Sequence, residues 1–232
     1  SITLKRNTMN EFIDRRLEKA YEYIIDGDLK SATKQFEDNL KENPNSIHLL
    51  MELANTYYIL GELNKSIGCY RKVLTIKPDS PYVLYRMGVA LYRSTLFTEA
   101  TEVFNKIIAS GKHLPMTYLW LGLSYYHLGK EEKSIESYRK LLEYCPETQM
   151  ANYYMGVSLK SAGKYDEAII HFERLLSSCA TCNQHVSALY HLGRTYMKKF
   201  NYEQAKVHFK HAMELDPSNK NASEMYNYLM DL

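Results

Sequence analysis

The sequence predicts an all-α fold in which pairs of helices are repeated along the chain and stacked as a solenoid. The first observation is a set of small residues that recur every 34 residues, with a final step of 37: Ala20, Ala54, Gly88, Gly122, Gly156 and Gly193. A second set consists of turn-forming residues with the same period and the same late displacement: Gly27, Gly61, Gly129, Gly163, Pro44, Pro78, Pro146 and Pro217. Self-similarity at a fixed period of this length is typical of repeat architectures.

Each period is predicted to form two helices. In one period, Tyr118, Leu121 and Tyr125 are at helical spacing in the first half, and Tyr138 and Leu141 in the second. Glycine separates the halves, where a chain reversal needs a residue that tolerates positive φ, and proline follows because it cannot continue a helix. An aromatic residue holds the same place in every second helix: Phe36, Tyr70, Phe104, Tyr138, Phe172 and Phe209. Such helix pairs must stack on neighbours to bury this face.

Helix starts and close packing agree with this division. Ser80 followed by Pro81 predicts an N-cap and a first helical position, and Thr8 with Glu11 predicts a capping box before the first helix. We expect the small residue of each first helix to let that helix approach its own second helix. The residues expected to face it there are Ala100, Ser134 and Ala168.

The segment from Tyr118 to Tyr125 reads Tyr-Leu-Trp-Leu-Gly-Leu-Ser-Tyr and continues through Gly129, Ser134, Tyr138 and Pro146. This pattern resembles the tetratricopeptide repeat (TPR) family, and the resemblance covers about nine tenths of the chain. It implies a right-handed superhelical solenoid of six helix-turn-helix repeats with a C-terminal capping helix. The boundaries that follow are a lead segment with the start of the first helix at 1–12, repeats at 13–46, 47–80, 81–114, 115–148, 149–185 and 186–219, and the capping helix at 220–232.

The sequence departs from the family pattern at three places. The first repeat has Arg16 and Lys19 where large apolar residues belong, as expected of a terminal repeat with one side in water. The third repeat ends in Ser110-Gly111-Lys112 without its proline, and the fifth carries a three-residue insertion around Cys179 to His185.

Composition excludes several classes of function. The chain has 29 basic and 27 acidic residues and a formal net charge of +2, so no concentrated positive field would gather nucleic acid or anionic lipid. No apolar stretch is long enough to span a bilayer, and four cysteines are too few for a disulfide framework. We expect a soluble chain in the reducing cytoplasm. Because it begins with Ser1 rather than Met, the sequence leaves an upstream signal or anchor open.

The resemblance also implies a binding surface, because TPR arrays usually bind through a concave face made mainly of first helices. The residues placed on that face in repeats three to five are Tyr82, Tyr85, Val89, Tyr92, Met116, Leu119, Leu123, Tyr126, Met150, Tyr153 and Val157. Most are apolar or aromatic, which favours a partner helix or an extended peptide with an apolar face. The alternative is that superhelical curvature or the chain's own ends, above all Ser1 to Asn7, cover the strip.

One TPR subgroup holds the C-terminal carboxylate of heat-shock chaperones with Lys, Asn and Arg on three successive first helices. The equivalent places here hold Met51 and Asn55, then Arg86, then Met116 and Trp120. The residue types do not match, so we do not expect a chaperone-tail clamp.

Two further groups carry weaker hypotheses. The last repeat is rich in basic residues that could contact an acidic partner at the end of the groove: Arg194, Lys198, Lys199, Lys206, His208, Lys210 and His211. Ordinary solvated charge is the alternative. Cys179, Cys182 and His185 have metal-ligand spacing, but zinc needs four ligands and the nearest further cysteine, Cys145, is one repeat away.

No glycine-rich phosphate loop, pair of metal-binding histidines or serine nucleophile elbow occurs in the sequence. We therefore expect no enzymatic activity and no cofactor or metal. The predicted function is that of a protein–protein interaction scaffold or adaptor that binds a peptide or helix in the apolar groove of repeats three to five. Two alternatives are a homo-oligomeric scaffold, assembled through the groove and the N-terminal segment, and a regulatory domain of a larger protein.

Overall fold

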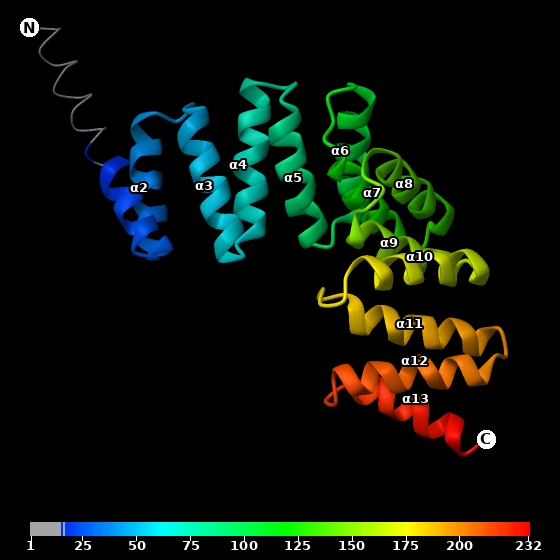
Figure 1. Cartoon of the computed structure of the whole chain (residues 1–232). Coiled ribbons are helices and arrows are strands. Elements are labelled where there is room, and N and C mark those ends of the chain that lie inside the picture. Colours follow the sequence, from blue (N-terminus) through cyan, green and yellow to red (C-terminus); the bar gives the residue numbers. More distant parts are fainter. Residues whose placement is uncertain (1–14, 16) are drawn as a thin grey trace, which may run out of the picture. The chain divides into compact units, whose positions relative to one another are not determined.

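The computed structural model describes residues 15 and 17–232, and all regular secondary structure in this part is helical (Figure 1). The lead segment 1–12, the capping box of Thr8 and Glu11, and Arg16 lie outside the described residues. The predicted all-α repeat solenoid is confirmed. The division into six repeats remains a prediction.

The chain forms two compact units, Ser1–His113 and Leu114–Leu232. In the first unit, helical backbone over 17–25 is followed by α2 (Leu29–Glu42), α3 (Ile47–Leu60), α4 (Leu63–Ile76), α5 (Pro81–Arg93) and α6 (Phe97–Ala109). From α2 to α6, each helix packs against the next. The segment without a proline at Ser110-Gly111-Lys112 directly precedes the boundary between the units.

The second unit repeats this arrangement with its own helices. They are α7 (Met116–His127), α8 (Glu131–Tyr144), α9 (Gln149–Ser161), α10 (Tyr165–Ser178), α11 (His185–Lys198), α12 (Tyr202–Leu215) and α13 (Lys220–Met230). Each helix packs against the next, and α9 also contacts α11. The last helix, α13, lies within the range predicted for the capping helix.

Side chains with short polar groups start several of the helices. Asp28, Ser46, Asn201 and Asn219 each accept a hydrogen bond from the backbone N–H three residues further on, which satisfies one of the free donors of the first turn. Ser80 also lies at an N-cap position before Pro81, but its side chain makes no capping hydrogen bond. Proline at the first helical position and the packing of α5 define that helix start instead.

The turns between paired helices share one backbone conformation. Gly27, Gly61, Gly129 and Gly163 have φ values between 66° and 79°. Thr95 and Phe200 hold the corresponding places in two other pairs, with φ values of 61° and 57°. Positive φ is uncommon for residues with a Cβ atom, and for a bulky side chain it is an outlier. Phe200 therefore occupies a strained position.

Close helix approach depends on the glycines of the first helices. A Cβ atom added to Gly88, Gly156 or Gly193 would lie 2.6 to 2.7 Å from an aromatic ring of the following helix. A Cβ atom added to Gly122 would likewise lie too close to the ring of Tyr138. The expected neighbours Ala100, Ser134 and Ala168 are buried as well, and the Ser134 hydroxyl donates to the Gly122 carbonyl at 2.9 Å. The aromatic ring, more than the small residue opposite, defines the spacing.

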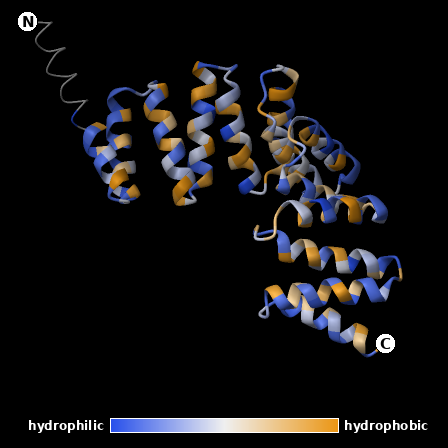
Figure 2. Cartoon of the chain, in the orientation of Figure 1, coloured by the Kyte–Doolittle hydropathy of each residue, from blue (hydrophilic) through white to orange (hydrophobic). Residues whose placement is uncertain are grey.

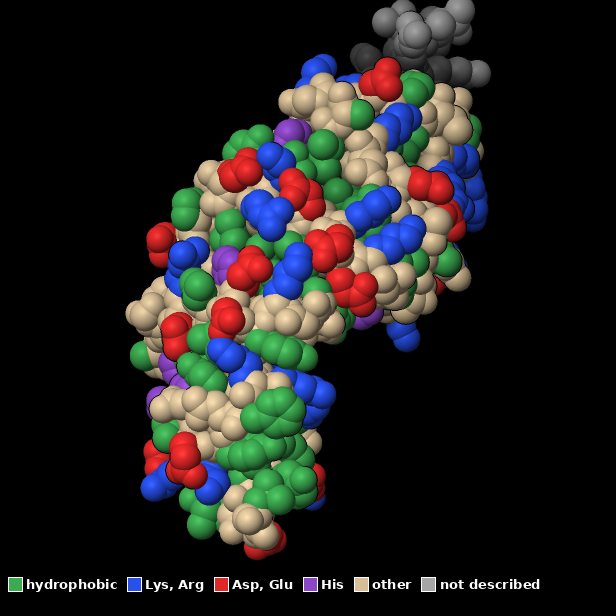
Figure 3. Space-filling view, turned by 90° about the vertical axis from the view of Figure 1, so that its right-hand side faces the viewer, with side chains coloured by type: hydrophobic (Ala, Val, Ile, Leu, Met, Phe, Trp, Pro, Cys, Tyr) green, Lys and Arg blue, Asp and Glu red, His purple; other side chains and the backbone are tan. Residues whose placement is uncertain are grey.

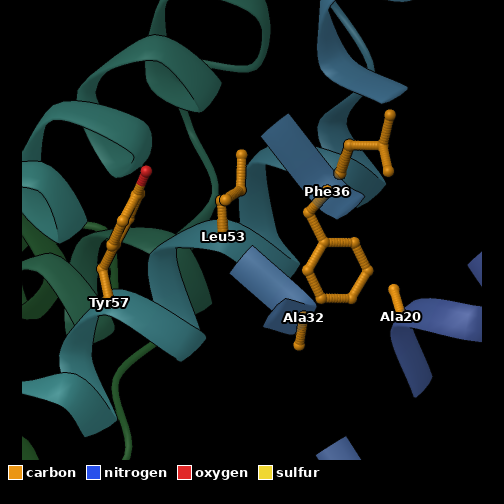
Figure 4. Packing of buried hydrophobic residues seen from close by; sticks show 6 residues of the cluster. Ala20, Ala32, Phe36, Leu53 and Tyr57 are labelled. Atoms are coloured by element: carbon orange, nitrogen blue, oxygen red, sulfur yellow. The ribbon is translucent and has the colours of Figure 1, made fainter. Parts of the chain in front are cut away.

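The cores of both units are made from the inner faces of these helices, and most helices carry hydrophobic residues on one side and hydrophilic residues on another (Figure 2). In the first unit, Phe36 belongs to a buried cluster that also contains Ala20, Ala32, Leu53 and Tyr57 (Figure 4). In the second, Leu229 of α13 packs with Ala205 and Phe209 of α12. The capping helix thus closes the apolar face of the preceding pair.

Candidate functional site

The predicted groove residues of the first unit lie on α5 and differ in exposure. Tyr82 is 57% exposed, whereas Val89 is 8% exposed and buried. Tyr85 and Tyr92 are partly buried, and their rings pack against Phe104 and Phe97 at centroid distances of 6.4 and 5.4 Å. The prediction that Val89 lines an open groove is wrong, because this side chain is part of the core.

Burial also corrects the prediction for α7. Leu119 and Leu123 are buried, with exposed fractions of 0% and 5%, so neither side chain is available to a partner. The sequence of this helix, Met-Thr-Tyr-Leu-Trp-Leu-Gly-Leu-Ser-Tyr-Tyr-His, is apolar on nearly every side. A helix that is apolar all round is buried, and its periodicity cannot show which side faces water. Met116 and Tyr126 on the same helix are partly buried.

The remaining predicted residues form a partly exposed stripe on α9. Met150, Tyr153 and Val157 are all partly buried, and successive members are one helical turn apart. The same spacing continues to Lys160. The neighbouring first helix, α11, carries a corresponding stripe of Tyr190, Arg194, Met197 and Lys198. Two adjacent first helices therefore present apolar residues that lead to basic residues at their C-terminal ends.

Lys160, which follows the α9 stripe, contacts an aromatic cluster. Its Nζ donates to Nδ1 of His191 at 2.9 Å, which requires a neutral imidazole that carries its proton on Nε2. The His191 ring stacks on Phe172 and packs against Tyr153, at centroid distances of 5.9 and 5.8 Å. Burial, reinforced by Lys160 and Arg194, lowers the pKa of His191 to about 4, so the imidazole is neutral near pH 7.

Three cations converge around a cleft of about 250 Å³, which is lined by Lys160, Ser161, Tyr165, Arg194 and Lys198. Burial, reinforced by the charges of Arg194 and Lys198, lowers the pKa of Lys160 to about 8. Among the described residues, no acidic side chain forms an ion pair with these three cations. The cleft is therefore a small region of uncompensated positive charge.

An apolar pocket of about 460 Å³ adjoins this cleft and shares Arg194 and Lys198 with it. Its other lining residues come from the end of α11, the following turn, α12, α13 and the residues after α13: Met197, Phe200, Tyr202, Met225, Tyr228 and Leu232. In the lowest part of Figure 3, formed by α11, α12 and α13, hydrophobic side chains gather beside Lys and Arg side chains. We call the cleft and the pocket together the C-terminal site.

The other basic residues of the last repeat have different surroundings. Lys199 pairs with Asp166, and Lys206 with Glu203 at 3.3 Å. The His208 ring stacks on Tyr196, and the His211 ring packs edge-on against His185. Lys210 is exposed on α12. Of the seven basic residues named from the sequence, Arg194 and Lys198 line the site.

Asn55 and Arg86, which occupy places of the chaperone-tail clamp, are bonded to each other. Asn55 Oδ1 accepts hydrogen bonds from the guanidinium of Arg86 at 3.1 Å and from the hydroxyl of Tyr70 at 2.9 Å. The guanidinium also lies over the ring of Tyr58, 5.3 Å from its centroid. The side chains of Asn55 and Arg86 thus have their interaction partners within the first unit.

The cysteine motif forms part of the inter-repeat loop. His185 Nδ1 donates to the carbonyl of Cys179 at 2.6 Å, so this ring nitrogen is hydrogen-bonded within the loop. A hydrogen bond from Cys182 lowers the pKa of the Cys179 thiol, and burial raises that of Cys182. Within residues 15 and 17–232, no group of three or more His, Cys, Asp or Glu could hold a metal ion.

Sequence reasoning missed Lys160, Phe200 and Tyr202. Lys160 carried no signal in the sequence, because its neighbours on α11 are distant along the chain. Phe200 did carry a signal, since it follows Gly163 by 37 residues and so replaces the turn glycine. Met225 and Tyr228 were assigned to the capping helix without a binding role, and they form one wall of the pocket.

Sequence comparison defines the family. Profiles described as TPR repeat or tetratricopeptide repeat match residues 54–94, 115–148 and 147–218. The chain belongs to the tetratricopeptide repeat family. A comparison with curated proteins found no match. No helix in the described part of this TPR chain is long and apolar enough to cross a membrane.

Solved structures with the same fold include several TPR proteins. YrrB, described as a TPR protein with an unusual peptide-binding site, is 22% identical, with a TM-score of 0.69 over 82% of this chain and 96% of its own. PilW, a type IV pilus biogenesis factor, is 20% identical, with a TM-score of 0.75 over 92% and 97%. A structure of MamA is 26% identical, with a TM-score of 0.65 over 68% and 93%. Family and fold together support a general role as a protein-interaction scaffold.

Proposed function

We propose that this TPR chain is an adaptor that binds a peptide or helical segment of another protein on the first-helix face of its second unit. The observation that carries the proposal is the pair of stripes on α9 and α11, where partly exposed apolar residues lead to cations that form no ion pair with the residues described. A scaffold has no need for catalytic groups, and the polar groups here are suited to contact rather than chemistry.

The proposed surface keeps Met150, Tyr153 and Val157 from the predicted groove and extends it toward the C-terminal end. An apolar stripe with a polar border is the usual composition of a peptide-binding groove. The peptide-binding site ascribed to YrrB supports a role of this kind, since that protein has the same fold. A helix or an extended peptide that lies across α9 and α11 would cover the stripe.

The proposal can be tested with peptides selected from a displayed random library on the purified chain. The Met150→Glu/Val157→Glu double variant should weaken binding of the selected peptides by about tenfold, because charges would enter an apolar contact. Ile170→Glu is the matched control, since Ile170 is 53% exposed on the second helix α10. Circular dichroism checks that both variants keep their helices.

Equal affinity of the double variant and the wild-type chain would contradict the proposed surface. If the chain selects no peptide, and sedimentation shows a concentration-dependent mass that the double variant abolishes, self-assembly through the same face is the better account.

A further inference from the structure

The cationic cleft has an energetic cost that no acidic side chain within the described part of the unit offsets. Lys160, Arg194 and Lys198 repel one another, and the amine of Lys160 is also partly removed from water. Nearby lysines are instead paired with acidic side chains: Lys164 pairs with Glu132 at 3.0 Å, and Lys199 pairs with Asp166. The three cleft cations lack such partners among the described residues, so an anion from outside would relieve their repulsion.

The pocket beside the cleft adds a second recognition element. Arg194 and Lys198 line both cavities, so one ligand can place an acidic group in the cleft and a large apolar group in the pocket. The pocket volume of about 460 Å³ is ample for an aromatic or long aliphatic side chain. A free anion would occupy only the cleft.

Phe200 gives an independent reason to regard the pocket as a binding site. Its φ of 57° is strained for an aromatic residue, and its side chain is 79% exposed, so burial in the core does not offset the strain. Glycine holds this turn position in other helix pairs, for example at Gly129 and Gly163. The aromatic ring lines the pocket, where a ligand could bury it.

We infer that the C-terminal site binds an acidic linear segment of another protein. Lys160, Arg194 and Lys198 hold more than one Asp or Glu side chain, and the pocket beside Phe200 holds a large apolar side chain of the same segment. This inference rests on the proposed function and names its partner class.

The chain's own acidic residues are poor candidates for this segment. Its adjacent acidic pairs are Glu37-Asp38 in α2, Glu131-Glu132 in the first turn of α8 and Asp166-Glu167 in the first turn of α10. One member of each pair is bonded to a lysine of its own unit. Nucleic acid fits less well than a peptide, because its binding needs a longer track of positive charge than this cleft provides.

The test uses the full chain and a displayed library of random peptides with no free carboxyl terminus. We expect the selected peptides to contain clustered Asp or Glu within a few residues of Phe, Trp, Leu or Met. One such peptide, acetylated and amidated, then serves as the probe in fluorescence anisotropy. Its affinity should fall with added salt, because salt screens partly exposed charges.

Two variants with matched controls separate recognition from folding. Lys160→Gln/Arg194→Gln/Lys198→Gln should lose about tenfold or more in affinity, whereas Lys206→Gln/Lys210→Gln on α12 should bind normally. Phe200→Gly should weaken binding by about fivefold and keep or raise the melting temperature, because it relieves strain. Thr95→Gly relieves the equivalent strain in the first unit and should leave affinity unchanged.

Selection of peptides without acidic residues would overturn the inference, as would unchanged affinity of the triple variant. If such peptides are still weakened by Met150→Glu/Val157→Glu, the adaptor role stands and only the partner class is wrong. If no peptide depends on either surface, both proposals fail. Tighter binding of a short RNA than of any selected peptide, or selection only from a library with free carboxyl termini, also overturns the acidic-segment assignment.

Discussion

Lys160 and His191 show how one hydrogen bond links two titrating groups. The lysine donates to the imidazole, so the imidazole must stay neutral for the bond to exist. His191 also faces the positive charge of Arg194. A second partly buried histidine, His171, has similar surroundings: its Nδ1 donates to Asn152 Oδ1 at 3.0 Å, and Arg174 and Arg139 are nearby. Both rings lie in the second unit and resist protonation.

The first prediction concerns acid stability. Burial lowers the pKa of His171 and His191 to about 4, below the unfolded value of about 6.5. The unfolded chain therefore binds more protons between these values, so stability is full above about pH 6.5 and falls as the pH approaches 4. We expect a loss of about 1–3 kcal/mol between about pH 7 and about pH 5, after allowance for partial exposure.

Urea unfolding followed by circular dichroism at both pH values measures this loss. The His171→Gln/His191→Gln variant should have a flatter dependence, since glutamine does not titrate. A dependence as steep as that of the wild-type chain would show that other groups are responsible.

The second prediction concerns the glycines at the helix contacts. Gly156→Ala should lower the free energy of unfolding by about 1–3 kcal/mol, because the new Cβ would lie 2.7 Å from the Phe172 ring. Gly68→Ala is the opposite case, since nothing lies within 4 Å of a Cβ added at this helical position in α4. There alanine should stabilise by about 0.5–1 kcal/mol. Denaturant titration should find opposite signs, and equal signs would contradict the packing described.

At the scale of helices, the sequence predicted the elements far better than their exposed sides. The small-residue period and the turn glycines are local signals, so the helix pairs could be placed from spacing alone. The exposed side of α7 could not be identified in this way, because Leu119 and Leu123 belong to a helix that is apolar all round. On the amphipathic α5, Tyr82 is exposed, as a groove residue must be, whereas Val89 is buried.

The candidate site was predicted only in part for a related reason. Its residues come from the five helices α9 to α13 and the segments next to them, and they meet only through tertiary packing, whereas spacing along one helix links residues such as Met150 and Val157. The insertion before α11 shifts the register of the last pair by three residues, so side chains of α9 and α11 cannot be matched by period alone. Arg194 and Lys198 were recognised as basic, but their approach to Lys160 was not.

The third prediction concerns the capping helix. Leu229 is 1% exposed and packs with Ala205 and Phe209, so Leu229→Ala should lower the free energy of unfolding by about 2–4 kcal/mol. The neighbouring Met230 is 58% exposed, and Met230→Ala should change stability by no more than about 0.5 kcal/mol. Thermal unfolding of the two variants measures the difference. Similar melting temperatures would mean that α13 does not close the array.

At the scale of the whole molecule, stability is expected to be distributed over neighbouring contacts. In repeat proteins each element contacts mainly the elements next to it, so no single core holds the chain together. The helices of this chain follow that rule within each unit. The boundary follows Gly111, which has a φ of 68°, and lies before Leu114, which is 57% exposed.

The fourth prediction follows from this division. A fragment of residues 114–232 contains every residue of the C-terminal site, so it should fold and bind the selected peptides with about the affinity of the full chain, within about threefold. Circular dichroism and anisotropy measure both properties. A helical fragment with much weaker binding would show that the first unit contributes to recognition.

The position of the strained turn and of α13 at one end of the stack has an evolutionary consequence. Duplication or loss of a helix pair ahead of α9 would change the length of the scaffold but would leave every wall of the cleft and pocket in place. A duplication after α12 would instead separate Phe200 from Tyr228 and divide the pocket. The length of the scaffold can thus change without changing the site when helix pairs are gained or lost before α9, but not when a pair is added after α12.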